Sequence, residues 1–136
     1  HLAKCCMPVP GDAIVGYVTK GRGVTVHRAD CPNVQSSREM SGRLIDVRWE
    51  NEAVQKQLFN TDLEIYGYNR SGLLNDVLQV LNAQTKALNN INGRVDHDKM
   101  ADIHVKVGVR NLAHLDKLMD AVKNVPDIYE VKRANG

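Results

Sequence analysis

Between residues 102 and 110 apolar and polar side chains alternate along the chain. The apolar members of this segment are Ile103, Val105, Val107 and Val109. The polar members are Asp102, His104, Lys106 and Arg110. Successive side chains of a β-strand point to opposite faces of its sheet, so the alternation is strong evidence for a strand that buries one face only. Such strands belong to antiparallel sheets whose second face meets solvent or a partner.

Two amphipathic helices are predicted on either side of this strand. Behind Ser71, which can act as the N-cap, the apolar residues are Leu73, Leu74, Val77, Leu78, Val80 and Leu81. Behind Asn111, which can act as a second N-cap, they are Leu112, Leu115, Leu118, Met119 and Val122. Each set forms one stripe of a helix with 3.6 residues per turn.

Strands are also predicted at residues 57–68, 87–97 and 128–133, with a tight turn at residues 98–99. The resulting order is β-α-β-β-α-β over about 75 residues, the size of one ferredoxin-like unit. Two helices that cover one face of a four-stranded antiparallel sheet would bury both apolar stripes. The other face is expected to be polar, although Tyr66 and Tyr68 on the first strand are candidates for a dimer contact.

The first third of the chain has a different character. Residues 13–19 and 24–28 read as a hairpin around a turn at residues 20–23, a helical turn is expected near residues 30–33, and residues 44–50 read as a further strand. Residues 52–56 look like a junction. We therefore expect an α+β chain of two domains, a small hairpin-rich cysteine domain at residues 1–54 and a ferredoxin-like domain at residues 55–136.

All three cysteines of the chain lie in the first domain. With His27, they supply three thiolates and one imidazole, a donor set that suits a closed tetrahedral Zn²⁺ site. The candidate ligands are Cys5, Cys6, His27 and Cys31. Adjacent cysteines depart from the usual C-x₂₋₄-C spacing, so a second interpretation stays open: the cysteines are small buried apolar residues and His27 makes an ordinary hydrogen bond. His1 is a further candidate ligand.

The charge and the cysteine count exclude several classes of protein. The chain has 18 Lys and Arg residues against 16 Asp and Glu residues, a net charge of +2. This excess is too small for a non-specific nucleic-acid binder, so any RNA contact must come from a local patch. An odd number of cysteines, two of them adjacent, argues against an extracellular disulfide scaffold. Without a long apolar run or a leader, we expect a cytoplasmic protein that does not cross a membrane.

Two motifs resemble a known family. The stretch C-C-M-P-V-P-G-D-A-I-V-G-Y-V-T-K-G-R-G-V-T-V-H-R-A-D-C-P-N at residues 5–33 resembles the conserved-cysteine, zinc-finger-like domain of the long Rel/SpoT enzymes, the bacterial (p)ppGpp synthetases and hydrolases. In that family an ACT domain of β-α-β-β-α-β topology follows, and the loop N-R-S-G-L-L-N-D-V at residues 69–77 is similar to its first loop.

The resemblance implies that the chain is the C-terminal regulatory portion of such a stringent-response enzyme, a GTP pyrophosphokinase, a (p)ppGpp hydrolase or both. It implies docking on the ribosome, against large-subunit rRNA and near a deacylated tRNA in the A site, with control of N-terminal catalytic domains. The RNA-contacting candidates are Lys20, Arg22 and Arg28 around the hairpin. The fragment itself is expected not to be an enzyme: no residue is predicted to be catalytic, and the G-R-G at residues 21–23 lacks the spacing of a phosphate loop.

The resemblance also implies a second candidate site. In ACT domains the loop before the first helix often binds an amino acid at a dimer interface. The corresponding residues are Asn69, Arg70, Ser71, Gly72, Leu73 and Leu74. A helix N-terminus offers free N–H groups to a carboxylate, and the leucines suit a branched-chain amino acid. The alternatives that stay open are a turn and helix cap without a ligand, and a module that only forms homodimers.

Overall fold

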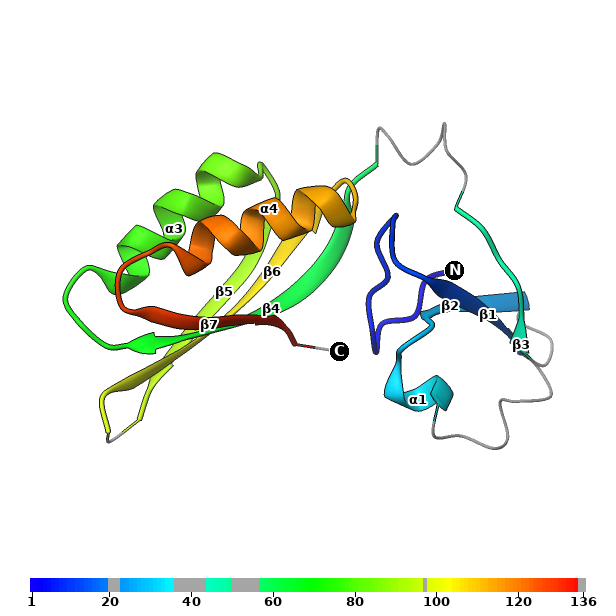
Figure 1. Cartoon of the computed structure of the whole chain (residues 1–136), viewed down its shortest axis with the longest axis horizontal. Helices are drawn as coiled ribbons and strands as arrows, with labels where there is room; N and C mark the ends of the chain where they lie inside the picture. Colours follow the sequence, from blue (N-terminus) through cyan, green and yellow to red (C-terminus); the bar gives the residue numbers. More distant parts are fainter. Residues whose placement is uncertain (20–22, 36–43, 50–56, 97, 135–136) are drawn as a thin grey trace.

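The structure of the chain is a computed structural model that describes residues 1–19, 23–35, 44–49, 57–96 and 98–134. These residues form a three-stranded sheet with one short helix and a four-stranded sheet with two longer helices (Figure 1). We call the described part of residues 1–49 the N-terminal lobe and the described part of residues 57–134 the C-terminal lobe. The predicted junction at residues 52–56, and with it the predicted domain boundary, lies outside the described residues.

The N-terminal lobe is built on the predicted hairpin. Strands β1 (Ile14–Thr19) and β2 (Gly23–Arg28) pair antiparallel, with Val15 opposite His27. Helix α1 (Pro32–Gln35) follows, and β3 (Leu44–Ile45) pairs with the other edge of β1, which gives the order β2-β1-β3.

The prediction of a strand over residues 44–50 was wrong at residues 46–49, and residue 50 lies outside the described residues. Only the first two residues pair with β1, and residues 46–49 leave the sheet. The reason lies at Trp49, whose ring packs edge-on against Phe59 of the C-terminal lobe with 5.5 Å between the ring centres. Its indole N–H donates to the carbonyl oxygen of Asp12 at 3.1 Å. The chain therefore leaves the sheet after Ile45, and its single tryptophan packs between the two lobes.

The C-terminal lobe has the predicted β-α-β-β-α-β order. Its elements are β4 (Phe59–Tyr68), α3 (Leu73–Gln84), β5 (Leu88–Val95), β6 (Met100–Val109), α4 (Leu112–Lys123) and β7 (Ile128–Arg133). The strand order is β5-β6-β4-β7, with every neighbouring pair antiparallel. Both helices cover the same face of the sheet (Figure 1). This arrangement confirms the α+β fold class that the sequence predicts.

The core of the C-terminal lobe lies between this sheet and the two helices. The alternating apolar residues of β6 are all buried, as are Leu63 and Ile65 of β4. They meet the helix stripes, whose fully buried members are Val77, Leu81, Leu115, Leu118 and Val122. The polar residues of β6 lie on the opposite face. The alternation in the sequence therefore separates core from solvent as predicted.

The two helices begin in different ways. Asn111 is the N-cap of α4, and its side chain accepts a hydrogen bond from the His114 amide at 2.8 Å, as predicted. The prediction of Ser71 as the N-cap of α3 was wrong. Gly72 occupies that position with a positive φ of 82°, and no side chain caps the helix. Glycine adopts this left-handed conformation at little cost, whereas serine does not.

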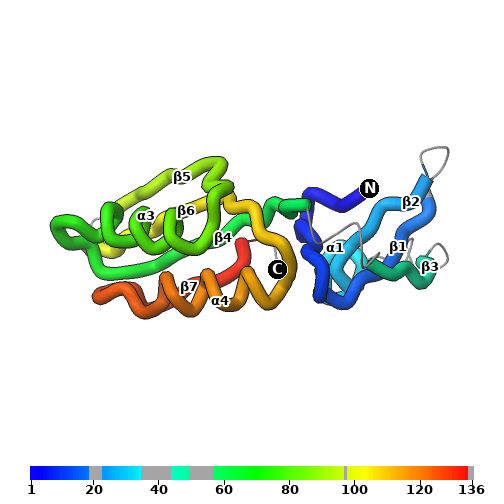
Figure 2. Tube along the Cα trace, turned by 90° about the horizontal axis from the view of Figure 1, so that it is seen from above, coloured from blue at the N-terminus to red at the C-terminus, as the bar shows by residue number. Residues whose placement is uncertain are grey.

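The two lobes meet at one end of the four-stranded sheet. Figure 2 shows the N-terminal lobe against the end of the C-terminal lobe where α4 begins and where β7 ends. None of the helices in the described part of the chain is long and apolar enough to cross a membrane.

Candidate metal centre and candidate binding surfaces

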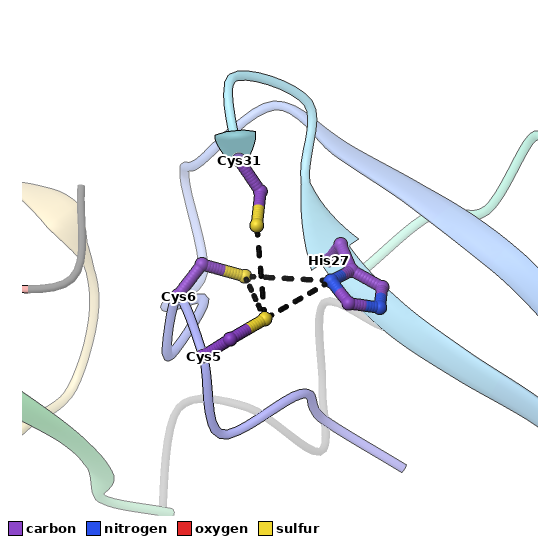
Figure 3. Close-up of side chains that lie close together, drawn as sticks. All are labelled: Cys5, Cys6, His27 and Cys31. Atoms are coloured by element: carbon purple, nitrogen blue, oxygen red, sulfur yellow. Dashed lines mark hydrogen bonds between the residues drawn. The ribbon is translucent and has the colours of Figure 1, made fainter. Parts of the chain in front are cut away.

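The four predicted metal ligands converge on one point. One donor atom from each of Cys5, Cys6, His27 and Cys31 lies within 4.8 Å of the others. We call these four residues the Cys/His cluster. The Cys5 Sγ lies 3.9 Å from the Cys6 Sγ, 3.7 Å from the Cys31 Sγ and 3.4 Å from the His27 Nδ1. Figure 3 shows the four side chains pointing toward a shared centre from three segments of the lobe.

The backbone of the N-terminal lobe brings these segments together. The first residues run beside β2, because the Ala3 amide donates to the Val26 carbonyl and the Val26 amide donates to the His1 carbonyl, at 2.9 and 2.8 Å. The chain then turns at residues 4–6, closed by a bond from the Met7 amide to the Ala3 carbonyl at 3.2 Å. This turn lets both adjacent cysteines face His27, which the sequence spacing alone did not lead us to expect.

Four of the six distances between donor atoms are close to those of a tetrahedral metal site. Zn–S bonds of about 2.3 Å at the tetrahedral angle place two sulfurs about 3.8 Å apart, and a Zn–N bond of about 2.0 Å gives a slightly shorter S···N distance. The Cys5 Sγ lies 3.9 and 3.7 Å from the other two sulfurs, close to the expected S···S distance. The His27 Nδ1 lies 3.4 Å from the Cys5 Sγ and 3.8 Å from the Cys6 Sγ, and these values bracket the expected S···N distance. A disulfide needs about 2.05 Å between sulfurs, and all three cysteines are free thiols. The cluster can therefore hold a metal ion.

Burial shapes the acid–base properties of the cluster. Cys6, His27 and Cys31 are buried. Burial raises the pKa of the Cys6 thiol to about 12, helped by the nearby Cys31 and Cys5 sulfurs. Burial also lowers the pKa of the His27 imidazole. Burial alone would raise the pKa of the Cys5 thiol, but hydrogen bonds with Asn33, Cys31 and Cys6 outweigh it and lower this pKa overall. The thiol protons would leave when a divalent metal binds.

Arg28 supports the cluster from outside. Its backbone amide donates to the Cys6 Sγ at 3.3 Å. Its guanidinium makes two bonds to the Asp30 carboxylate, at 2.9 and 2.8 Å, and its side chain is only 7% exposed. A phosphate contact needs an exposed guanidinium, so this geometry favours a supporting role for Arg28 over the RNA contact expected from the sequence. The other two expected RNA contacts, Lys20 and Arg22, lie outside the described residues.

Arg70 cross-links the loop at residues 69–74, which the sequence suggested as an amino-acid-binding site. The guanidinium of Arg70 donates to the carboxylates of Asp76 and Asp127 at 2.9 and 2.7 Å, and to the carbonyls of Ser71 and Pro126 at 3.1 and 3.0 Å. Of these four acceptors, Pro126 and Asp127 lie in the turn before β7, Asp76 lies in the first turn of α3, and Ser71 lies in the loop itself. This arrangement favours the interpretation of the loop as a turn and helix cap without a ligand.

The remaining residues of this loop have different surroundings. The Asn69 amide donates to the Lys99 carbonyl at 2.8 Å, which joins the loop to the β5–β6 turn. Leu73 is buried in the core of the C-terminal lobe, whereas Leu74 is exposed. The two leucines therefore do not form one apolar patch for a ligand.

Sequence reasoning missed one polar cluster on the open face of the four-stranded sheet. His104 lies 2.9 Å from Glu64 and 3.5 Å from Asp62, and burial together with the nearby Asp102 raises the pKa of the Glu64 carboxyl. Three of these residues line a shallow depression of about 420 Å³, together with Arg94 and neighbouring asparagines. The signal was present in the sequence: these side chains occupy alternate positions on the two paired strands β4 and β6.

Comparison with known proteins assigns both lobes. Residues 1–50 match the model of the RelA/SpoT RIS domain, and residues 55–133 match the model of the ACT domain. Among curated proteins, the chain is 36% identical over 132 residues to a GTP pyrophosphokinase of Streptomyces coelicolor, covering 97% of this chain and 15% of the relative. It is equally similar, at 36% over 132 residues, to the bifunctional (p)ppGpp synthase/hydrolase RelA of Mycobacterium tuberculosis, covering 18% of that protein.

The C-terminal lobe also resembles a solved structure. The solution structure of the ACT domain from the GTP pyrophosphokinase of Chlorobium tepidum aligns with a TM-score of 0.50 and 21% identity, over 58% of this chain and 89% of that one. This likeness concerns the fold alone. The chain spans between 15% and 18% of the length of the curated relatives named above. With a RIS domain model followed by an ACT domain model along its length, the chain belongs to the ACT-domain family and matches the RIS–ACT region of the RelA/SpoT proteins.

Proposed function

We propose that this chain is the C-terminal regulatory module of a RelA/SpoT-type (p)ppGpp synthetase, hydrolase or bifunctional enzyme. The observation that carries the proposal is the succession of a RIS domain match and an ACT domain match in relatives named for GTP pyrophosphokinase or (p)ppGpp synthase/hydrolase activity. In this proposal the catalytic chemistry belongs to other domains of the parent protein. The module senses starvation by docking to ribosomal RNA and A-site tRNA and passes the signal to those catalytic domains.

The N-terminal lobe is proposed as a metal-stabilised docking unit. This lobe has a small core of its own, formed by Ala3, Cys6, Cys31 and Val34. Small domains with such limited cores often depend on a structural metal, and binding of Zn²⁺ by three thiolates and one imidazole supplies folding free energy. The ligands would be Cys5, Cys6, His27 and Cys31. The Arg28 amide would then stabilise the charge on the Cys6 thiolate, as outer hydrogen bonds do in many metal sites.

The hairpin tip is the proposed RNA contact of this lobe. Lys20 and Arg22 lie in the segment that joins the paired ends of β1 and β2. The register of the two strands ends at Thr19 opposite Gly23, whereas His27 of the Cys/His cluster lies opposite Val15, near the other end of the paired strands. Lysine and arginine side chains are common phosphate contacts, so Lys20 and Arg22 are the proposed RNA-contacting residues of this lobe.

The test is co-sedimentation of the chain with large ribosomal subunits over a series of salt concentrations. Binding should weaken steeply as salt rises, and the double variant Lys20→Ala/Arg22→Ala should bind less tightly with a salt slope smaller by about two. The matched control is Lys86→Ala/Lys117→Ala, which removes the same charge from exposed positions of the C-terminal lobe. Equal weakening by both double variants, or no binding by the wild-type chain, would contradict the proposal.

Self-association is a second candidate function, favoured by one observation. Three tyrosines gather at one end of the open sheet face, where Tyr129 lies 5.4 Å from Tyr68 and 6.4 Å from Tyr66 between ring centres. Tyr68 is 56% exposed and Tyr129 is 45% exposed. Exposed aromatic clusters are typical of interfaces. Sedimentation equilibrium of wild type and of Tyr68→Ser/Tyr129→Ser tests this candidate: a dimer that the double variant abolishes would support it, and a monomeric wild type would contradict it.

A further inference from the structure

A short segment of the N-terminal lobe is embedded in the C-terminal lobe. We call residues 7–12 the docking segment. Val9 is 0% exposed and belongs to the hydrophobic core of the C-terminal lobe, in one cluster with Phe59 and Val109. Its side chain therefore completes a core that is otherwise built by β4, β6 and the helices. Loss of this contact would leave an apolar cavity at the end of the sheet.

The docking segment also bonds to the first residue of α4. The Leu112 amide donates to the Pro10 carbonyl at 2.6 Å. The first N–H groups of a helix have no partner within the helix, so Pro10 satisfies a donor that α4 cannot satisfy itself. At Gly11, where φ is +107°, a Cβ would lie 2.8 Å from the Cβ of Leu112. The approach of the two backbones therefore requires glycine.

An ion pair holds the other side of the docking segment. The guanidinium of Arg133, the last residue of β7, donates to the Asp12 carboxylate at 2.9 and 3.1 Å and to the Met7 carbonyl at 2.9 Å. The side chains of Arg133 and Asp12 are 14% and 9% exposed. The same carboxylate accepts a bond from the Val9 amide at 2.8 Å. Asp12 thus orders the docking segment and joins it to the opposite lobe.

The docking segment begins directly after the Cys/His cluster. Cys6 and Met7 are adjacent in the chain, and Met7 has a positive φ of 47°. A positive φ is unfavourable for a residue other than glycine. Two hydrogen bonds maintain it here: the Met7 amide donates to the Ala3 carbonyl, and the Arg133 guanidinium donates to the Met7 carbonyl. A rotation of the turn that carries Cys5 and Cys6 would therefore move the residues that contact the C-terminal lobe.

We propose that the docking segment couples the Cys/His cluster to the ACT domain, so that binding of a divalent metal and docking of the two lobes stabilise each other. Coupling between two sites is reciprocal: if the metal favours the docked state, docking must favour the metal by the same factor. Neither Arg133 nor Leu112 is among the four residues of the cluster. The coupling does not depend on RNA binding, so its failure and that of the proposed function can be told apart.

The first experiment is amide hydrogen exchange of the full chain with zinc bound and after removal of zinc by a chelator. The Leu112 amide reports docking, because its acceptor belongs to the other lobe. The His114 amide is the internal control, because its acceptor is Asn111 in the same lobe. We expect chelation to speed exchange of Leu112 and to leave His114 unchanged. Unchanged protection of Leu112 in a chain that has lost its zinc would overturn the proposal.

The second experiment measures zinc affinity by competition with a chromophoric chelator. Arg133→Met should weaken zinc binding about tenfold, whereas Arg94→Met, which removes an exposed guanidinium from the same sheet, should not. Gly11→Ala gives an independent variant, because it pushes the docking segment off Leu112 without changing any charge. Wild-type affinity in both Arg133→Met and Gly11→Ala would overturn the proposal, as would a wild-type chain that binds no zinc.

Discussion

The backbone carbonyl of Asp127 occupies the space in which a side chain at Gly67 would begin. A Cβ at Gly67 would lie 2.6 Å from this oxygen and 3.3 Å from the Cα of Ile128. The same carbonyl accepts a hydrogen bond from the Tyr68 amide at 2.8 Å, at the point where the register between β4 and β7 shifts. The turn that leads into β7 therefore packs directly against the backbone of β4, the first strand of the ACT domain.

Gly67→Ala is therefore expected to destabilise the chain. Two of the three nearest atoms, the Asp127 oxygen and the Ile128 Cα, are backbone atoms that cannot rotate away, so the strand pair must separate, at a cost of roughly 1 to 3 kcal/mol. Denaturant unfolding measures this cost. Gly93→Ala is the matched control in the same sheet, because its Cβ would meet only Ile103, at 4.0 Å. A Gly67 variant as stable as the Gly93 variant would show that the turn at Asp127 can move.

One zinc per chain is expected from elemental analysis of protein purified without added metal. Cys31→Ser should remove this zinc, because three donors no longer close the tetrahedral site, and the melting temperature should fall with it. His104→Gln is the control, since it removes an imidazole that lies outside the cluster. A folded chain without metal would favour the alternative in which the cysteines are buried apolar residues.

Arg70→Met is expected to lower the melting temperature of the ACT domain. The variant loses two ion pairs and two carbonyl bonds, of which those to Asp127 and Pro126 tie the loop before α3 to the turn before β7. Because Arg70 is partly exposed, the deficit relative to wild type should shrink as salt rises. Arg94→Met, with a single ion pair of 3.7 Å, should change little.

The same assay tests the amino-acid site. If the loop is only a turn and cap, added leucine leaves the melting temperature of the wild-type chain unchanged. A stabilisation by leucine that disappears in Gly72→Val or Arg70→Met would instead favour a branched-chain amino acid as the ligand.

Glu64→Gln is expected to change how stability depends on pH. Burial, and then the hydrogen bond and charge of Asp102, raise the pKa of the Glu64 carboxyl, while His104 acts in the opposite direction. A carboxyl whose pKa is higher in the folded state favours folding while it is protonated. Its contribution is fully present below the unfolded pKa of about 4.3 and is lost as pH rises through the folded pKa.

Thermal unfolding over a pH series measures this effect. The Glu64→Gln variant should be more stable than wild type at neutral pH, and the difference should disappear below about pH 4. Glu130→Gln, at an exposed position of β7, is the control. A constant difference at all pH values would mean that the Glu64 side chain acts through packing instead.

The sequence predicted the parts of the fold that depend on periodic burial. Strand β6 followed from its alternation and α4 from its apolar stripe and the Asn111 cap, because both features are local. The start of α3 was harder, since a serine in the loop suggested a side-chain cap, whereas the backbone uses the left-handed freedom of Gly72. Trp49 shows a tertiary contact that overrides local strand propensity.

The candidate metal site was only partly predictable. The four donors could be named from residue type, but their convergence depends on pairing of the first residues with β2, which no local pattern reveals. Arg28 illustrates the limit for charged residues: its sequence position near a hairpin suggested an exposed cation, and Asp30, two residues away, instead holds it against the cluster. The docking segment had no recognisable signal, because Val9 and Gly11 look like ordinary loop residues.

The ion pair between Asp12 and Arg133 has a consequence for the order of folding. Its partners are separated by 121 positions in the chain. Closing so long a loop is entropically costly until the intervening strands and helices have formed, so this contact is expected to form late. During synthesis the docking segment would leave the ribosome well before its acceptor surface exists. Each lobe would then fold first, and the junction between them would complete the native state in a final step.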